Sequence, residues 1–202
     1  TPLIAEEFVR FDREVSVIAV RSTLGKTAFY PLTENVHAGG ILRSSRAPLR
    51  AAGAAALQRL AERHARRVMR EVGYVGVLAI EFFQRGDELL ANEMAPRVHN
   101  SGHWTIDGAA CSQFENHLRA ITGLPLGSTE PLGPVGMVNL IGDWPPLARL
   151  AAIENARVHL YDKQPRPGRK VGHVNVAAHS VAAREHVMRA VEREIRRLGS
   201  VS

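Results

Sequence analysis

The stretch that decides the fold assignment is residues 92–104, which read Asn92-Glu93-Met94-Ala95-Pro96-Arg97-Val98-His99-Asn100-Ser101-Gly102-His103-Trp104. After an apolar strand, it places a cation, two imidazoles, an amide, a hydroxyl and a glycine close together. Functional groups collect in loops at the ends of strands. The density of polar groups therefore indicates a functional site and not a simple connection.

The hairpin that leads into this stretch consists of two expected strands, residues 75–83 and 88–94. The polar turn between them, Gln84-Arg85-Gly86-Asp87, contains glycine and indicates antiparallel pairing. If the turn is centred on its last residue, Glu81 and Glu93 pair directly and share one face. Two like charges so placed favour a cation between them, and Mg²⁺ suits two carboxylates with room for phosphate. From spacing alone, an ordinary exposed hairpin face is the alternative.

Zinc is the alternative interpretation of the two histidines. His99 and His103 have the four-residue spacing of a helical ligand pair. However, Pro96 and the segment Asn100-Ser101-Gly102 disfavour a helix, and no third soft ligand lies nearby. The pattern therefore favours magnesium over zinc.

A second basic segment, residues 161–173, reads Tyr161-Asp162-Lys163-Gln164-Pro165-Arg166-Pro167-Gly168-Arg169-Lys170-Val171-Gly172-His173. Prolines and glycines predict a turn that holds its cations together. Backbone amides near Gly168, with Lys163, Arg169 and Lys170, are suited to a sugar phosphate. A solvated basic loop is the alternative, because runs of charge usually lie at the surface.

The remaining periodicity predicts an α+β fold. Expected strands are residues 14–20, 27–31, 135–141, 157–161 and 172–177, and expected helices are residues 51–72, 109–121, 147–154 and 181–198. Glycine- and proline-rich residues 127–134 predict a joint between two subdomains.

Composition narrows the class of protein. The chain has 202 residues, 45% apolar and 23% charged, as in a globular protein. Its formal charge of +6 fits nucleic acid or phosphorylated small molecules, but the basic residues are dispersed and no aromatic residues interleave with them. No segment approaches the roughly 20 apolar residues that cross a bilayer. The single cysteine, Cys111, excludes an internal disulfide framework. We expect a cytoplasmic protein without nucleic-acid or membrane partners.

Several segments together resemble the 5-(carboxyamino)imidazole ribonucleotide synthase family of ATP-grasp ligases. They are residues 6–9, 13–16, 30–37, 73–77, 92–104, 112–115 and 161–173. The resemblance implies the carboxy-terminal half of an ATP-grasp fold, an antiparallel sheet with flanking helices, followed by a small α/β carboxy-terminal subdomain. It implies a division into residues 1–22 as a remnant of the lid, 23–126 as the main sheet and 127–202 as the carboxy-terminal subdomain.

Members of that family use ATP and bicarbonate to carboxylate the exocyclic amine of 5-aminoimidazole ribonucleotide, through carboxyphosphate, with release of ADP and phosphate. The resemblance therefore implies ATP and Mg²⁺ as cofactors and a homodimer as the assembled state. The family's amino-terminal domain is absent from this chain, so we expect weak or no catalysis from it alone. Another ATP-grasp ligase with a different acceptor, or a noncatalytic nucleotide-binding remnant, is the alternative.

The family also implies roles for individual residues. The residues expected to bind the nucleotide are Glu6, Glu7 and Val9 in an adenine hinge, Glu14 at the ribose hydroxyls, His37, Asn92 and Glu93. The metal ligands would be Glu81 and Glu93.

The remaining implied roles belong to two groups of residues. The residues expected to be catalytic are Arg97, His99 and Asn100, and those expected to bind the substrate phosphate are Lys163, Arg169 and Lys170. Ala95 departs from the pattern, because many ATP-grasp enzymes have asparagine two places after the second metal carboxylate.

Overall fold

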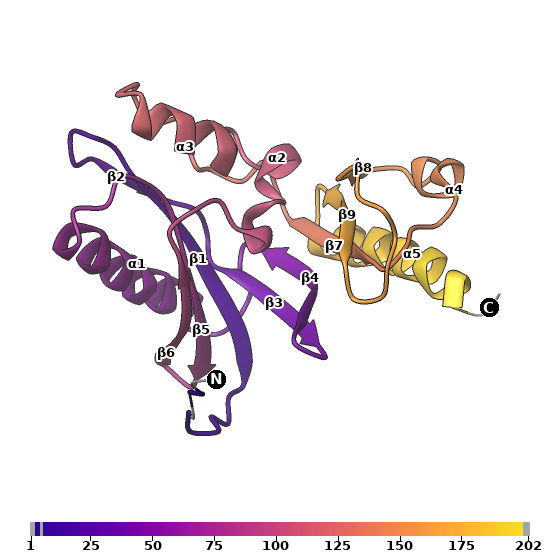
Figure 1. Cartoon of the computed structure of the whole chain (residues 1–202), viewed down its shortest axis with the longest axis horizontal. Coiled ribbons are helices and arrows are strands. Elements are labelled where there is room, and N and C mark those ends of the chain that lie inside the picture. Colours follow the sequence, from indigo (N-terminus) through magenta and orange to yellow (C-terminus); the bar gives the residue numbers. More distant parts are fainter. Residues whose placement is uncertain (1–2, 5, 200–202) are drawn as a thin grey trace.

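One antiparallel sheet runs through the computed structural model, which describes residues 3–4 and 6–199 (Figure 1). The strand order is β6-β5-β1-β3-β4-β7-β9-β8, and β2 pairs with β1. The strands are β1 (Arg13–Arg21), β2 (Thr27–Phe29), β3 (Thr33–Ala38), β4 (Ile41–Ala47), β5 (Gly76–Arg85), β6 (Glu88–Ala95), β7 (Val135–Ile141), β8 (Ala156–Leu160) and β9 (Lys170–Ala177). The helices are α1 (Ala54–Glu71), a 3-10 turn η1 (Asn100–Gly102), α2 (Thr105–Gly108), α3 (Gln113–Ile121), α4 (Leu147–Ala151) and α5 (Val181–Gly199).

Helices cover the sheet on both faces. Helix α1 buries a stripe with helical spacing that includes Leu57, Ala61 and Met69, and this stripe packs on one face of β1 and β5. The segment from η1 to α3 covers the opposite face, where Trp104 is 1% exposed (Figure 1). Helix α5 packs on β7 and β9 around Met188. The sheet with its two covered faces confirms the expected α+β class.

The structure differs most from the sequence-based prediction at two places. Strands β3 and β4 were not expected, because β3 contains Thr33, Glu34, Asn35 and His37 and lacks an apolar face. The helix expected over residues 109–121 begins at residue 113. Ser112 caps it, since its Oγ accepts a hydrogen bond from the Glu115 amide at 3.1 Å.

The sheet continues across the expected subdomain joint. Strand β4 pairs with β7, so the strands before and after residues 127–134 are hydrogen-bonded to each other. Strand β1 lies between β5 and β3 in the interior of the sheet, and the division expected at residue 23 falls directly after it. Among the described residues, no helix has the length and apolar character required to cross a membrane.

Candidate functional site

A β-bulge in the β5–β6 hairpin brings the two predicted carboxylates together. Near the turn Phe82 pairs with Ala91, and beyond it Glu81 pairs with Glu93, which leaves Asn92 as an extra residue. The direct pairing of Glu81 with Glu93 is thus confirmed, but the bulge creates it, because the turn itself lies between Gly86 and Asp87.

The bulge also changes which face the end of β6 presents. Leu89 packs in the core under α1, whereas Ala95 packs in the core on the opposite face. In an uninterrupted strand, residues 89 and 95 would point to the same side. The extra Asn92 inverts the alternation and turns Glu93 toward the face that carries residues 97–104.

The two carboxylates line a polar cavity of about 350 Å³ on this face of the sheet. Its walls come from β1, the β3–β4 hairpin, β5, β6, the following loop and β9. The lining residues are Glu14, His37, Gly39, Gly40, Leu42, Glu81, Asn92, Glu93, His99 and Lys170. Of the predicted site residues, the fold therefore gathers Glu14, His37, Glu81, Asn92, Glu93, His99 and Lys170 into one cavity.

Opposite charges meet inside this cavity. Burial raises the pKa of Glu81, and the carboxylates of Glu93 and Glu14 add to that rise while His37 opposes it. Burial lowers the pKa of Lys170, although Glu81 and Glu93 favour its charged form. Glu14 forms an ion pair with the His37 ring at Nδ1. A cation added beside Glu81 would relieve the repulsion among these carboxylates.

Glu81, Glu93 and His99 are the described residues placed closely enough to hold a metal ion. One ligand atom from each lies within 4.8 Å of the others. His99 Nδ1 is 3.7 Å from Glu81 Oε1, and His99 Nε2 is 3.7 Å from Glu93 Oε1. Two carboxylates beside open space fit Mg²⁺, which prefers oxygen ligands and keeps positions for water and phosphate.

A chain of buried hydroxyl and amide groups orients His99. Ser45 donates to Asn35 Oδ1 at 2.8 Å, Asn35 Nδ2 donates to Ser16 Oγ at 2.9 Å, and Ser16 Oγ bonds to Ser101 Oγ at 2.9 Å. Ser101 Oγ lies 2.9 Å from His99 Nδ1, which also accepts from the Ser101 amide. The Nε2 atom is left to face Glu93.

Burial decides the charge of His99. Together with the charges of nearby groups, chiefly Arg97 and Lys170, it lowers the pKa of His99 to about 4. The carboxylate contacts at 3.7 Å are longer than hydrogen bonds. The imidazole is therefore neutral near pH 7.

The other two residues predicted to be catalytic do not line the cavity. The Asn100 amide pairs reciprocally with Asn139 on β7, at 3.0 and 2.7 Å, and so ties the loop to the sheet. Arg97 is exposed, and its Nη1 donates to the Val98 carbonyl at 3.0 Å. Asn100 thus has a clear structural role, whereas the Arg97 side chain stays exposed at the surface.

The predicted phosphate-binding residues lie along one loop but reach different places. Lys170 opens β9 and enters the carboxylate cavity. Lys163 is exposed and stands 5.2 Å from the centre of the Tyr161 ring, while Arg169 is half-buried. Tyr161 Oη is 2.7 Å from His173 Nδ1, which anchors the start of the loop. Of these three cations, Lys170 is the one that lines the carboxylate cavity.

The residues predicted for an adenine hinge stand apart from this cavity. Glu6 and Glu7 are exposed and Val9 is half-buried, in a segment without regular secondary structure that precedes β1. They are not among the residues that line the cavity.

Several residues of the site were missed by sequence reasoning. Gly39 and Gly40 form the tip of the β3–β4 hairpin with φ of 61° and 71°, and the tip borders the cavity beside Leu42. Adjacent glycines between polar and apolar segments are a hairpin signal that could have predicted this turn. Ser16 and Asn35 gave no such signal, because a buried polar network depends on neighbours distant in sequence.

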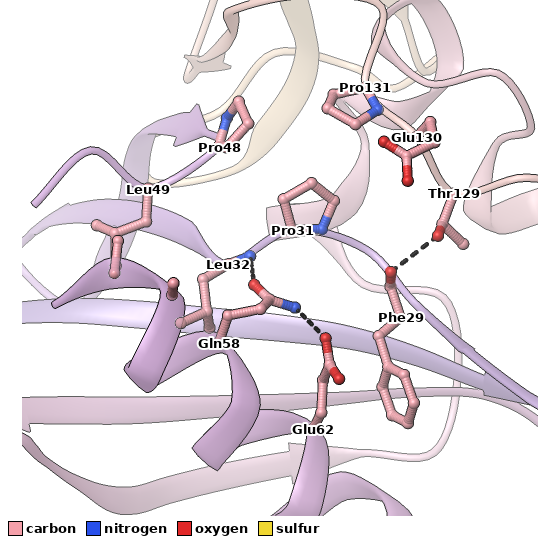
Figure 2. A pocket seen from close by; sticks show the side chains of 12 residues that line it. Phe29, Pro31, Leu32, Pro48, Leu49, Gln58, Glu62, Thr129, Glu130 and Pro131 are labelled. Atoms are coloured by element: carbon pink, nitrogen blue, oxygen red, sulfur yellow. Dashed lines mark hydrogen bonds between the residues drawn. The ribbon is translucent and has the colours of Figure 1, made fainter.

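A second hollow, of about 340 Å³, lies on the α1 side and is less suited to a nucleotide (Figure 2). Gln58 Oε1 accepts from the Leu32 amide at 2.6 Å, and its Nε2 donates to Glu62 at 2.8 Å. Thr129 donates to the Phe29 carbonyl at 2.8 Å. The lining contains no lysine, arginine or histidine, so it offers no cation to a phosphate.

The zinc alternative finds no support in the geometry. His103 Nδ1 accepts a hydrogen bond from Gln113 Nε2 at 3.0 Å. Among the described residues, the group that could hold a metal contains His99 but not His103. The two histidines do not form the ligand pair that their spacing allows.

A carboxylate pair on an antiparallel sheet, opposite a polar loop and a basic strand end, defines an ATP-grasp domain. The family model of the ATP-grasp domain matches residues 1–114, more than half of the chain, and the chain belongs to this family. Residues 136–186 match the family model described as the phosphoribosylaminoimidazole carboxylase C-terminal domain.

Within the ATP-grasp family, the similar curated relatives are N5-carboxyaminoimidazole ribonucleotide synthases, which confirms the resemblance stated from the sequence. The protein of this name from Pseudomonas aeruginosa is 54% identical over 175 residues, which cover 87% of this chain and 48% of the relative. The one from Escherichia coli is 50% identical and covers 86% and 48%. The chain thus spans about half the length of the curated relatives that it matches.

Solved structures that are similar to this chain are synthases of the same kind. N5-carboxyaminoimidazole ribonucleotide synthetase from Thermus thermophilus superposes with a TM-score of 0.90 at 59% identity, over 93% of this chain and 52% of the other. The synthase from Aspergillus clavatus, in complex with ADP and 5-aminoimidazole ribonucleotide, has a TM-score of 0.87 at 34% identity, over 94% and 53%. The expected ATP-grasp fold is therefore confirmed.

Proposed function

We propose that the whole protein carboxylates 5-aminoimidazole ribonucleotide with ATP and bicarbonate and yields N5-carboxyaminoimidazole ribonucleotide, ADP and phosphate. The observation that carries this proposal is the pairing of Glu81 with Glu93 across from His99 and Lys170 in one cavity. The named relatives, one of them solved with ADP and the ribonucleotide, support the choice of acceptor.

The chain's own residues suit the roles that this reaction requires. Glu81 and Glu93 would hold Mg²⁺, which would neutralise the phosphates of ATP when bound. Glu14 and His37 would hold the nucleotide, with the segment of Glu6, Glu7 and Val9 as its adenine hinge.

On the acceptor side, the neutral His99 would donate a hydrogen bond from its Nε2–H to an oxygen of the carboxyphosphate, and the exposed Arg97 would bind the same group. Asn100 would act through its bond to Asn139. Lys163, Arg169 and Lys170 would bind the ribonucleotide phosphate, and Lys170 would connect the two halves of the site.

We propose a division of labour along the chain as well. Residues 23–126 would carry most of the metal and nucleotide site, residues 127–202 would add the phosphate-binding loop, and residues 1–22 would include the adenine segment. Because Glu14 on β1 lines the cavity, part of that first segment contributes directly to the nucleotide site.

Titration calorimetry with Mg·ADP tests the metal and nucleotide site in the 202-residue chain. We expect Glu93→Ala to weaken binding at least about tenfold, because one of two metal ligands is lost. Glu88→Ala is the matched control, since Glu88 lies on the same strand and pairs with Arg85 at 2.9 Å, away from the cavity. Equal affinity of the Glu93→Ala variant and the parent chain would contradict the assignment.

A hybrid enzyme tests the acceptor. Residues 1–202 replace the matching half of the Pseudomonas aeruginosa relative, and ADP release is measured with and without 5-aminoimidazole ribonucleotide and bicarbonate. We expect release to depend on both, and to disappear with Glu93→Ala but not with Glu88→Ala. Stimulation by a different acceptor would favour another ATP-grasp ligase.

We also propose that the whole protein is a homodimer. Helix α3 exposes an apolar row, Phe114, Leu118 and Ile121, at 36%, 59% and 46%. Glu115 and Arg119 flank the row, so two copies of α3 packed antiparallel would set the acidic end of each against the basic end of the other. Sedimentation should show a dimer that Leu118→Arg dissociates, and an unchanged dimer would exclude this surface.

A further inference from the structure

Gln113, the first residue of α3, clamps the loop that carries His99. The side chain is fully buried, at 0% exposure. Its Oε1 accepts from the His99 amide at 3.0 Å, and its Nε2 donates to the His99 carbonyl at 2.7 Å. A backbone amide can only donate and a carbonyl can only accept, so these two bonds fix the orientation of the side-chain amide.

The second hydrogen of Gln113 Nε2 fixes the protonation of a neighbouring histidine. Nε2 lies 3.0 Å from His103 Nδ1. Since the amide nitrogen has no lone pair to offer, His103 Nδ1 must accept, and the ring proton belongs on Nε2. Burial, with the charges of Lys170, His159 and Arg97, lowers the pKa of His103 to about 4. The ring is neutral near pH 7.

The sequence makes room for this contact at Gly102. A Cβ on that residue would lie 2.8 Å from Gln113 Oε1 and 2.9 Å from Ile18 Cγ1, closer than real contacts allow. Only glycine lets the glutamine amide lie against the loop. The glycine between Ser101 and His103 therefore serves the clamp.

The His103 ring lies beside the start of the basic loop. Its Nε2 atom is not one of the fully buried unpaired polar atoms of the described residues. The ring stands edge-on to Tyr161 with centroids 6.2 Å apart, and 5.3 Å from His173. The imidazole therefore packs against Tyr161, at the start of the loop that ends in Lys170, and against β9.

We propose that Gln113 is a positioning residue that locks His103 as the neutral Nε2–H tautomer, so that the imidazole donates a hydrogen bond to an acceptor oxygen of the phosphorylated substrate. The identity of that substrate rests on the proposed function, whereas the tautomer does not. With its Nδ1 lone pair engaged and its proton on Nε2, His103 acts as a donor and not as a base or a metal ligand.

Nitrogen-15 spectroscopy of the 202-residue chain, labelled at histidine, tests the tautomer directly. Two-bond ¹H–¹⁵N correlations should show an unprotonated Nδ1 and a protonated Nε2 for His103 at pH 7, with the assignment made by loss of these signals in His103→Asn. Protonation at Nδ1 in the parent chain would overturn the proposal.

Two variants at Gln113 sharpen the test. In Gln113→Glu the carboxylate can only accept, so Nδ1 of His103 should become protonated. The matched control is Gln58→Glu, because Gln58 bridges the Leu32 amide and the Tyr30 carbonyl in the same way without a histidine. It should leave the His103 signals unchanged. If Gln113→Glu does not fold, Gln113→Met removes the donor and should give a mixture of both tautomers.

The hybrid enzyme then tests the consequence for the substrate. Gln113→Glu should raise the KM for 5-aminoimidazole ribonucleotide at least about fivefold and leave the KM for ATP within about twofold, while Gln58→Glu changes neither. A parent hybrid without ribonucleotide-dependent turnover would defeat the proposed function and leave the tautomer standing. An active parent whose KM for the ribonucleotide is unaffected by Gln113→Glu would defeat the role inferred for His103.

Discussion

The β5–β6 and β3–β4 hairpins border the same cavity, yet they are stabilised in opposite ways. In β5, Ile80 and Phe82 are each 2% exposed and pack under α1, so the hairpin carries Glu81 on a rigid apolar base. In the β3–β4 hairpin, Asn35 and Ser45 are 4% and 0% exposed and are held by hydrogen bonds to each other and to β1. One hairpin depends on packing, and the other on a completed polar network.

The difference between the two hairpins matters for the cavity that they border. Packing holds the metal carboxylates without using their oxygens, which leaves those oxygens for a cation. The polar network ends at His99 Nδ1 and leaves Nε2 to face Glu93. The two hairpins should therefore respond differently to substitution.

The largest expected effect is in the packed hairpin. Ile80→Ala should lower the free energy of unfolding by about 2–5 kcal/mol, because the variant loses apolar burial and leaves a cavity under α1. Met94 is the control, since it pairs with Ile80 across the strands but is 55% exposed. Met94→Ala should cost less than about 1 kcal/mol in urea denaturation. Equal losses would show that the hairpin does not depend on its packed side.

A smaller loss is expected in the polar network. Asn35→Leu should cost about 1–3 kcal/mol, because the buried hydroxyl of Ser45 loses its acceptor. Adding Ser45→Ala removes the orphaned hydroxyl, so the double variant should be more stable than the sum of the single changes predicts. Strict additivity in urea denaturation would mean that the hydrogen bonds do not act as a network.

The smallest expected effect concerns His173, a buried histidine on β9. Burial lowers the pKa of His173 from 6.5 to about 3, so the unfolded chain binds a proton that the folded chain excludes. This stability is present above about pH 6.5 and is lost as pH falls toward 3. Between pH 7.5 and 5.5 the loss should be about 1 kcal/mol from this residue.

Replacement of His173 should remove that part of the pH dependence. Urea denaturation at both pH values would show a smaller difference for His173→Gln than for the parent chain. His186→Gln serves as the control, because His186 is exposed on α5 and should leave the difference unchanged. An undiminished difference in His173→Gln would assign the acid sensitivity to other groups.

The features of the site that the sequence predicted are those with a signal in a short stretch of residues. The Glu81–Glu93 pairing followed from a turn and two apolar strands, although the bulge at Asn92 was not foreseen. The early start of the 109–121 helix was wrong because Ser112 caps the helix, and a capping residue was available in the sequence. The roles of all the predicted site residues stay predictions, and Arg97, Lys163 and Arg169 in addition do not line the cavity.

By itself, the sequence determined the α+β class, the hairpin with its carboxylates and the resemblance that the family models confirm, because periodicity, turn residues and short motifs are local properties. The tertiary structure decided the features that depend on residues far apart in the sequence. The strand β3 is polar in sequence, and its Asn35 can be buried because Ser16 and Ser45 bond to its side-chain amide, with Ser101 bonded to Ser16 in turn. The tautomer of His103 likewise depends on Gln113, ten residues away, because a hydrogen bond is satisfied only when both partners have been placed.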